Sequence, residues 1–217
     1  MRKAVFTISA LALLSALSGC GREQQSANDA SPDNEMNTIM AATSPFGDAE
    51  IRMNDAMMKV VGVNAGDSWV RKMIEHHKGA VEISRQVLTM NPEARVAQMA
   101  QQTIDKQTKA ITVLERLVAQ GNPDPASAEL YGPTMDKMHQ AMMTATGKTL
   151  SETFFRKMLE HHKGAVAMSD IALANGVTGA VHTQVEKTKA DQQKEVDNVE
   201  AMLSSQPMTA TQTSPPS

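Results

Sequence analysis

The eleven residues "RKMIEHHKGAV" at positions 71–81 occur a second time, as "RKMLEHHKGAV", at positions 156–166. The two copies differ only at Ile74, which corresponds to Leu159. With the same shift of 85 positions, residues 53–118 align with residues 138–203 without a gap. Similarity at a fixed period indicates that a supersecondary unit was duplicated. Two units are too few for a solenoid, so we expect a globule with a pseudo-two-fold axis.

Each unit is predicted to be helical, because its apolar residues recur at steps of three and four. Asp67 and Ser68 signal the start of one long helix, and Asn91-Pro92 signals its end. The expected helices of the first unit cover residues 49–61, 67–90 and 93–119. The counterpart of the first covers residues 134–145, and the second and third are also repeated in the second unit. Four long helices in two hairpins, with short extra helices, predict an all-α four-helix bundle.

Both ends of the chain are expected to lie outside the folded unit. Arg2 and Lys3 precede an apolar run of signal-peptide length, and "LSGC" at 17–20 resembles the lipobox of bacterial lipoproteins. The resemblance implies cleavage before Cys20 and lipid attachment there; the alternative is an ordinary secretory signal with a chance cysteine. The predicted segments are a signal peptide (1–19), a flexible tether (20–48), a helical domain (49–204, with repeats at 49–120 and 134–204) and a disordered tail (205–217).

The composition excludes several classes of function. A net charge of -3 and an aromatic content of 3% argue against a nucleic-acid partner. Cys20 is the only cysteine, so a lipidated chain has no thiol for a disulfide or a cysteine-rich zinc site. Methionine is abundant, with 17 residues in 217. No catalytic constellation is identified, and we therefore expect a binding protein rather than an enzyme.

The repeated histidines are the candidate metal ligands. Adjacent helical residues point about 100° apart, so His76 and His77 lie on neighbouring stripes, both largely apolar. We expect one histidine from each repeat to meet across the pseudo-axis, with methionine sulfurs nearby and the other two histidines as supporting partners or a separate site. The alternative is that the histidines are core residues bonded to backbone carbonyls. The predicted primary ligands are His76, His77, His161, His162, Met73 and Met158.

Further methionines and two glutamines extend this hypothesis. Gln107 and Gln192 are expected on the inward stripe of the third helices, where an amide can orient a metal-bound imidazole; the alternative is that they face water. Thioether with imidazole suits Cu(I) and tolerates Cu(II), whereas zinc prefers thiolate, imidazole and carboxylate. Copper, preferentially Cu(I), is therefore the predicted metal. The predicted additional ligands are Met53, Met57, Met138, Met142, His139 and Met168.

Other repeated residues have structural interpretations. Glu75 and Lys78 are expected on a solvated charged face, together with Lys72 and Glu82. Glycine in the middle of a helix costs about 1 kcal/mol. A close helix contact, or space beside the histidines, would explain that cost at Gly79 and at its counterpart, Gly164.

The chain resembles a bacterial family at these residues, namely domain-of-unknown-function family 305 (DUF305), whose signature is close to M-x-x-H-H. Residues 73–77 and 158–162 match it, and "QQKEV" at 192–196 fits the family's Gln-x-x-Glu pattern. At Gln107 the corresponding stretch, "QTKAI", has lost the acid. The resemblance implies a ferritin-like helical bundle that is secreted or lipid-anchored. For some family members it also implies periplasmic copper binding and copper tolerance.

The function predicted from the sequence is a copper-binding lipoprotein that buffers or transfers copper in the cell envelope. It would face the periplasm from a lipid anchor, with a copper-handling envelope protein as a partner. Gly21 after Cys20 lacks the Asp associated with inner-membrane retention, which favours the outer membrane. The alternatives are a metal-free structural or adaptor lipoprotein and a b-type haem bundle with Met and His ligands. A di-metal oxidase is disfavoured because no Glu-x-x-His occurs.

Overall fold

The computed structural model describes residues 44–205, all in helices or their connections. The predicted signal peptide, Cys20, tether residues 20–43 and tail residues 206–217 lie outside the described residues. The prediction that the tether extends to residue 48 is wrong, because Phe46 is fully buried in the core and the first helix begins at Gly47. The helices are α2 (Gly47–Lys59), α3 (Ala65–Leu88), α4 (Ala94–Glu115), α5 (Pro125–Glu129), α6 (Gly132–Thr144), α7 (Leu150–Ala174) and α8 (Gly179–Ser205). Residues 44–205 contain no strand, which confirms the predicted all-α class.

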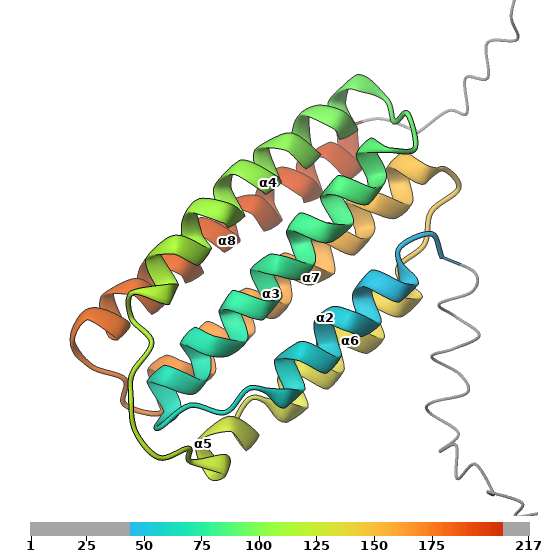
Figure 1. The fold of residues 1–217 in the computed structure, drawn as a ribbon. Helices are drawn as coiled ribbons and strands as arrows, with labels where there is room; N and C mark the ends of the chain where they lie inside the picture. Colours follow the sequence, from blue (N-terminus) through green and yellow to red (C-terminus); the bar gives the residue numbers. More distant parts are fainter. Residues whose placement is uncertain (1–43, 206–217) are drawn as a thin grey trace, which may run out of the picture.

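The two repeats form two stacked layers of three helices each. In Figure 1, α3 and α7 lie side by side in the centre, with α4 and α8 on one side of them and α2 and α6 on the other. The hairpins α3–α4 and α7–α8 make up the predicted four-helix bundle. The short helices α2 and α6 pack on α3 and α7 and on each other, so they are part of the core.

Local signals set the helix boundaries. α3 begins two residues before the predicted start, because the Asn64 side chain accepts a hydrogen bond from the Asp67 backbone N–H at 3.0 Å. α7 begins in the same way, with Thr149 capping the backbone N–H of Glu152. The carboxylate of Asp67 turns instead to the loops, where it accepts from the backbone N–H groups of Val63 and Ala119.

The central core is built from equivalent positions of the two repeats. Trp69 of α3 and Phe154 of α7 correspond in the alignment and are both fully buried. Phe154 packs against Phe46 and Phe155, with ring centroids 6.1 Å apart in each case. Burial of such large rings stabilises the fold by about 1.5–3 kcal/mol per side chain.

The mid-helix glycines are explained by close helix contact, one of the two predicted reasons. A Cβ atom on Gly79 would lie 2.7 Å from the Cβ of Met53, and one on Gly164 would lie 3.0 Å from the Cβ of Met138. These distances are too short for carbon atoms, so only glycine lets α2 approach α3 and α6 approach α7 this closely.

The prediction that Lys72 belongs to a solvated face is wrong. Its side chain is buried, and its ammonium group donates to the carbonyls of Met57 and Val60 at the end of α2. The last carbonyls of a helix lack partners within the helix, and α2 covers this face of α3. Glu75 and Lys78, by contrast, lie toward the solvent as expected, and there they form an ion pair.

The equivalent lysine in the second repeat, Lys157, is also buried but has an ionic partner. It donates to the carbonyl of Met142 and pairs with Glu50 of α2 at 2.7 Å. Burial raises the pKa of Glu50, and the adjacent Lys157 opposes that rise. The alignment places Met135 where the first repeat has Glu50, so Lys72 has no such carboxylate.

No helix within residues 44–205 is long and apolar enough to cross a membrane.

Candidate functional site

The four repeated histidines lie near the centre of the molecule, on α3 and α7, and are all buried. Within each pair the two rings are in edge-to-face contact, with centroids 5.7 Å apart for His76–His77 and 5.5 Å apart for His161–His162, but their other neighbours differ. The histidines therefore separate into an inner pair, His76 and His161, and an outer pair, His77 and His162.

The inner pair meets between the two repeats, as predicted for one histidine from each. The rings of His76 and His161 stack with centroids 3.6 Å apart. Nε2 of each ring lies 3.1 Å from the backbone carbonyl oxygen of the other residue. A carbonyl only accepts, so both rings carry their proton on Nε2 and donate. These two histidines thus match the alternative prediction of core residues bonded to carbonyls.

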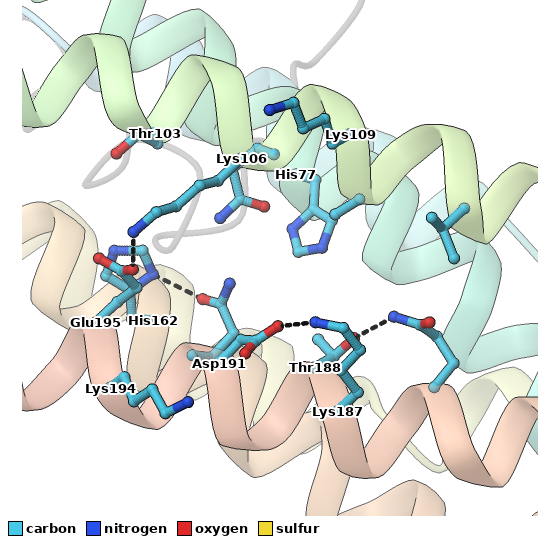
Figure 2. Close-up of a pocket in the computed structure, with 15 residues that line it drawn as sticks. His77, Thr103, Lys106, Lys109, His162, Lys187, Thr188, Asp191, Lys194 and Glu195 are labelled. Atoms are coloured by element: carbon cyan, nitrogen blue, oxygen red, sulfur yellow. Dashed lines mark hydrogen bonds and ion pairs between the residues drawn. The ribbon is translucent and has the colours of Figure 1, made fainter.

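The outer pair opens onto a pocket of about 500 Å³ between α4 and α8. Figure 2 shows the side chains around it, including Thr103 and Lys106 from α4 and Thr188 and Asp191 from α8. Most lining residues come in equivalent pairs from the two repeats, so the pocket lies on the axis that relates them. The buried polar lining consists of His77, His162, Gln107, Gln192, Thr103 and Thr188.

Gln192 orients His162. Nδ1 of His162 lies 2.7 Å from the amide oxygen of Gln192, which accepts the ring proton. The proton on Nδ1 leaves the lone pair on Nε2, and this atom is buried without a hydrogen-bond partner among the described residues. The inward position predicted for Gln192 is confirmed, and its amide contacts a histidine there.

The first repeat carries the same two side chains without the hydrogen bond. Nδ1 of His77 and the amide oxygen of Gln107 are each buried, and neither has a partner within residues 44–205. Gln107 lies inside, on the pocket, so the alternative that it faces water is wrong. The pocket therefore contains several polar atoms with unused hydrogen-bonding or metal-binding capacity.

Burial keeps the histidines neutral. It lowers the pKa of His77 to about 3, with further lowering from His161 and His162. It also lowers the pKa of His162, although the hydrogen bond to Gln192 opposes this. The pKa values of His76 and His161 fall well below the usual range for the same reason. A neutral imidazole retains the lone pair that a metal ion requires.

Charged side chains surround the pocket mouth. Lys106 of α4 reaches across to Glu195 of α8, beside His162 (Figure 2). Lys187 pairs with Asp191 within α8. Lys109 and Lys194 occupy equivalent positions in the two repeats and are exposed. The sequence patterns singled out none of these charged groups, because their role depends on how α4 and α8 face each other.

The predicted methionine ligands lie away from this pocket. Met73, Met158, Met57, Met142 and Met168 are buried core residues, and Met53 and Met138 cover the two mid-helix glycines. His139 is buried on α6, and its Nδ1 has no partner among the described residues. None of these side chains lines the pocket. Within residues 44–205, no three side chains of His, Cys, Asp or Glu are grouped to hold one metal ion.

Comparison with known proteins identifies a family. Neither a curated protein nor a solved structure matches the chain. The family described as "Domain of unknown function (DUF305)" matches residues 12–118 and again residues 119–203. These two segments contain the two histidine motifs, and together they account for most of the chain. The chain therefore belongs to the DUF305 family.

Proposed function

We propose that this protein binds copper in the pocket between α4 and α8, with His77 and His162 as its imidazole ligands. One observation carries the proposal: both rings are neutral, open onto one pocket and have a buried ring nitrogen without a partner. A buried polar atom without a partner costs about 1–3 kcal/mol. A bound metal ion would offset that cost.

The outer pair suits this role better than the inner pair. His76 and His161 use Nε2 in reciprocal hydrogen bonds and are fully buried, so an ion would have to separate the two stacked rings to reach them. His77 and His162 line a pocket, and Gln192 already holds His162 with Nε2 as the free nitrogen. Partners of this kind orient metal-bound histidines.

The donor atoms that line the pocket determine which oxidation state of copper it can bind. Imidazole binds copper in both states, whereas thioethers select Cu(I). Because no methionine lines this pocket, it does not discriminate against Cu(II). The methionines predicted as ligands lie in the core on α2, α3, α6 and α7 rather than at the pocket. We therefore extend the sequence-based preference for Cu(I) to both states.

The proposal places the protein in the cell envelope. Lipid attachment at Cys20 would anchor it to a membrane, with the outer membrane favoured, and the helical domain would face the periplasm. There it would buffer copper or transfer it to another copper-handling protein. Loss of labelled fatty-acid incorporation in Cys20→Ala tests the anchor, and equal incorporation in this variant and the parent chain contradicts it.

Two alternatives are less well supported. A haem held by one methionine and one histidine is disfavoured, because no methionine lines this pocket. A metal-free adaptor accounts for the inner histidines, which donate to carbonyls through Nε2. Their Nδ1 atoms are also buried without a partner among the described residues, so it is the pocket beside the outer pair that favours a ligand there.

Competitive titration tests the copper site. The full chain, freed of metal, is titrated with Cu(I) and Cu(II) against a chromogenic chelator. We expect one ion per chain, and at least a tenfold loss of affinity in the double variant His77→Ala/His162→Ala. The matched control, His139→Ala/His182→Ala, also removes two histidines but leaves the pocket intact. Absence of binding by the parent chain, or equal loss in both variants, contradicts the proposal.

A further inference from the structure

The pocket between α4 and α8 is much larger than a metal ion. It holds about 500 Å³, whereas one water molecule occupies about 30 Å³ in the liquid. Pockets of about 300–1,000 Å³ are the usual size for small organic ligands. Bound copper would therefore leave most of the pocket for another molecule.

The protein also supplies few strong metal ligands there. His77 and His162 line the pocket, and no group of three His, Cys, Asp or Glu side chains exists within residues 44–205. Cu(II) favours a tetragonal arrangement of nitrogen and oxygen donors, which two imidazoles do not complete. Apart from weak oxygen donors such as the amide of Gln107, the remaining donors would come from water or from a ligand that enters with the ion.

The charge at the pocket mouth favours an anion. Four lysines and two carboxylates line the pocket, and both carboxylates already pair with Lys106 or Lys187. Lys109 and Lys194 have no carboxylate partner among the described residues. An excess of one sign of charge around a pocket raises the local concentration of oppositely charged ligands.

Neutral donors deeper in the pocket suit the same kind of ligand. The amide oxygen of Gln192 accepts from His162, so its NH₂ group points elsewhere and can donate. Gln107 provides a second amide, and Thr103 and Thr188 provide hydroxyl groups. These side chains come as equivalent pairs from the two repeats. A ligand with two similar oxygen-bearing ends would match that arrangement.

We infer that the pocket takes copper together with a small chelating dicarboxylate, an inference that rests on the copper function proposed above. His77 and His162 hold the ion, and two carboxylate oxygens of the ligand complete its coordination. The outer carboxylate oxygens accept hydrogen bonds from the amides and hydroxyls and face the ammonium groups of Lys109 and Lys194. The protein is then a receptor for a chelated copper ion rather than for the bare ion.

Equilibrium dialysis with oxalate tests this inference. The full chain is dialysed against radiolabelled oxalate with and without one equivalent of Cu(II). We expect about one oxalate per chain to be retained with copper and none to be retained without it. Ethylenediamine, which chelates copper but carries no carboxylate, is the matched control, and we expect no retention of it. Equal retention of ethylenediamine, or copper-independent retention of oxalate, overturns the inference.

Two variants locate the site. His77→Ala/His162→Ala should abolish retention of both copper and oxalate. Lys109→Gln/Lys194→Gln should weaken oxalate retention at least fivefold while the affinity for Cu(II) alone stays the same. Copper bound tightly with no oxalate retained overturns the inference and leaves the copper function standing. If the chain binds no copper either with or without oxalate, both this inference and the copper function are overturned.

Discussion

His76 and His161 stack with ring centroids 3.6 Å apart, and each donates from Nε2 to the backbone carbonyl of the other. This reciprocal contact joins α3 to α7 at the centre of the bundle. It also separates the repeated histidines by role: the inner rings hold the two repeats together, and the outer rings line the pocket.

Replacing an inner histidine should cost stability rather than copper affinity. His76→Ala removes a fully buried ring and a hydrogen bond, and we expect a loss of about 2–4 kcal/mol in the free energy of unfolding. His77 borders a pocket, so water can fill the space left by His77→Ala, and we expect a smaller loss of about 1 kcal/mol in the free energy of unfolding. Urea denaturation followed by the fluorescence of the single tryptophan, Trp69, measures both. Copper affinity should fall more in His77→Ala than in His76→Ala. If His76→Ala loses more of both stability and copper affinity, the division of roles is contradicted.

Replacing Gln192 should lower the affinity for copper more than replacing Gln107. Gln192→Leu removes the hydrogen bond that keeps the lone pair of His162 on Nε2, and loss of such a partner typically costs 10–100-fold in metal affinity, or roughly 1.4–2.7 kcal/mol. Gln107→Leu makes the same chemical change where no hydrogen bond exists, so a smaller effect is expected. The competitive titration described above measures both variants. Equal losses would mean that His162 does not depend on this bond.

Alanine at a mid-helix glycine should destabilise this protein. Gly→Ala inside a helix usually stabilises by about 1 kcal/mol, but Gly79→Ala would force a carbon atom against Met53. We expect a net loss of about 1–3 kcal/mol in thermal or urea unfolding. Adding Met53→Gly, which removes the Cβ that alanine would keep, should relieve the clash, so that the double variant loses less than the sum of the two single variants. Additive losses would show that the two residues are not in contact.

Breaking the buried ion pair should be more harmful than removing it. Glu50→Gln leaves the ammonium of Lys157 buried without its carboxylate, which is expected to cost about 3–5 kcal/mol of unfolding free energy. Glu50→Met/Lys157→Met replaces both charges with apolar groups and should recover most of the loss. The equivalent of Glu50 in the second repeat, Met135, is already a buried methionine. A double variant less stable than Glu50→Gln contradicts this expectation.

Stability should fall as the pH drops below neutrality. Burial lowers the pKa of each of the four central histidines, to about 3 for His77, whereas an unfolded chain takes up these protons near pH 6.5. Below about pH 6.5 the unfolded state therefore binds more protons than the folded state. Each histidine then lowers the free energy of unfolding by about 1.4 kcal/mol per pH unit until its folded pKa is reached.

Urea titrations at pH 7.5, 6 and 5 measure this slope. The variant His77→Gln removes one of the four groups, so its slope between pH 6 and 5 should be smaller by about 1.4 kcal/mol per pH unit. An unchanged slope in His77→Gln would show that this ring is protonated in the folded protein.

Much of the fold follows from local sequence. The steps of three and four between apolar residues predicted the helices, and the shift of 85 positions predicted two equivalent halves that meet at their histidines. The position of Lys72 was mispredicted from the same pattern. Helical periodicity tells which residues share a face, but the helix that covers that face, here α2, is set by long-range packing.

The sequence by itself determined the helices, the duplication and the division of each histidine pair between two faces, because these depend on the 3.6-residue turn and on residues close along the chain. Only the tertiary structure decided which ring of each pair is satisfied by a carbonyl and which borders a pocket, and that the methionines lie away from it. Those distinctions depend on how α3 meets α7 and how far α4 stands from α8, and contacts between such distant segments leave no periodic signal in the sequence.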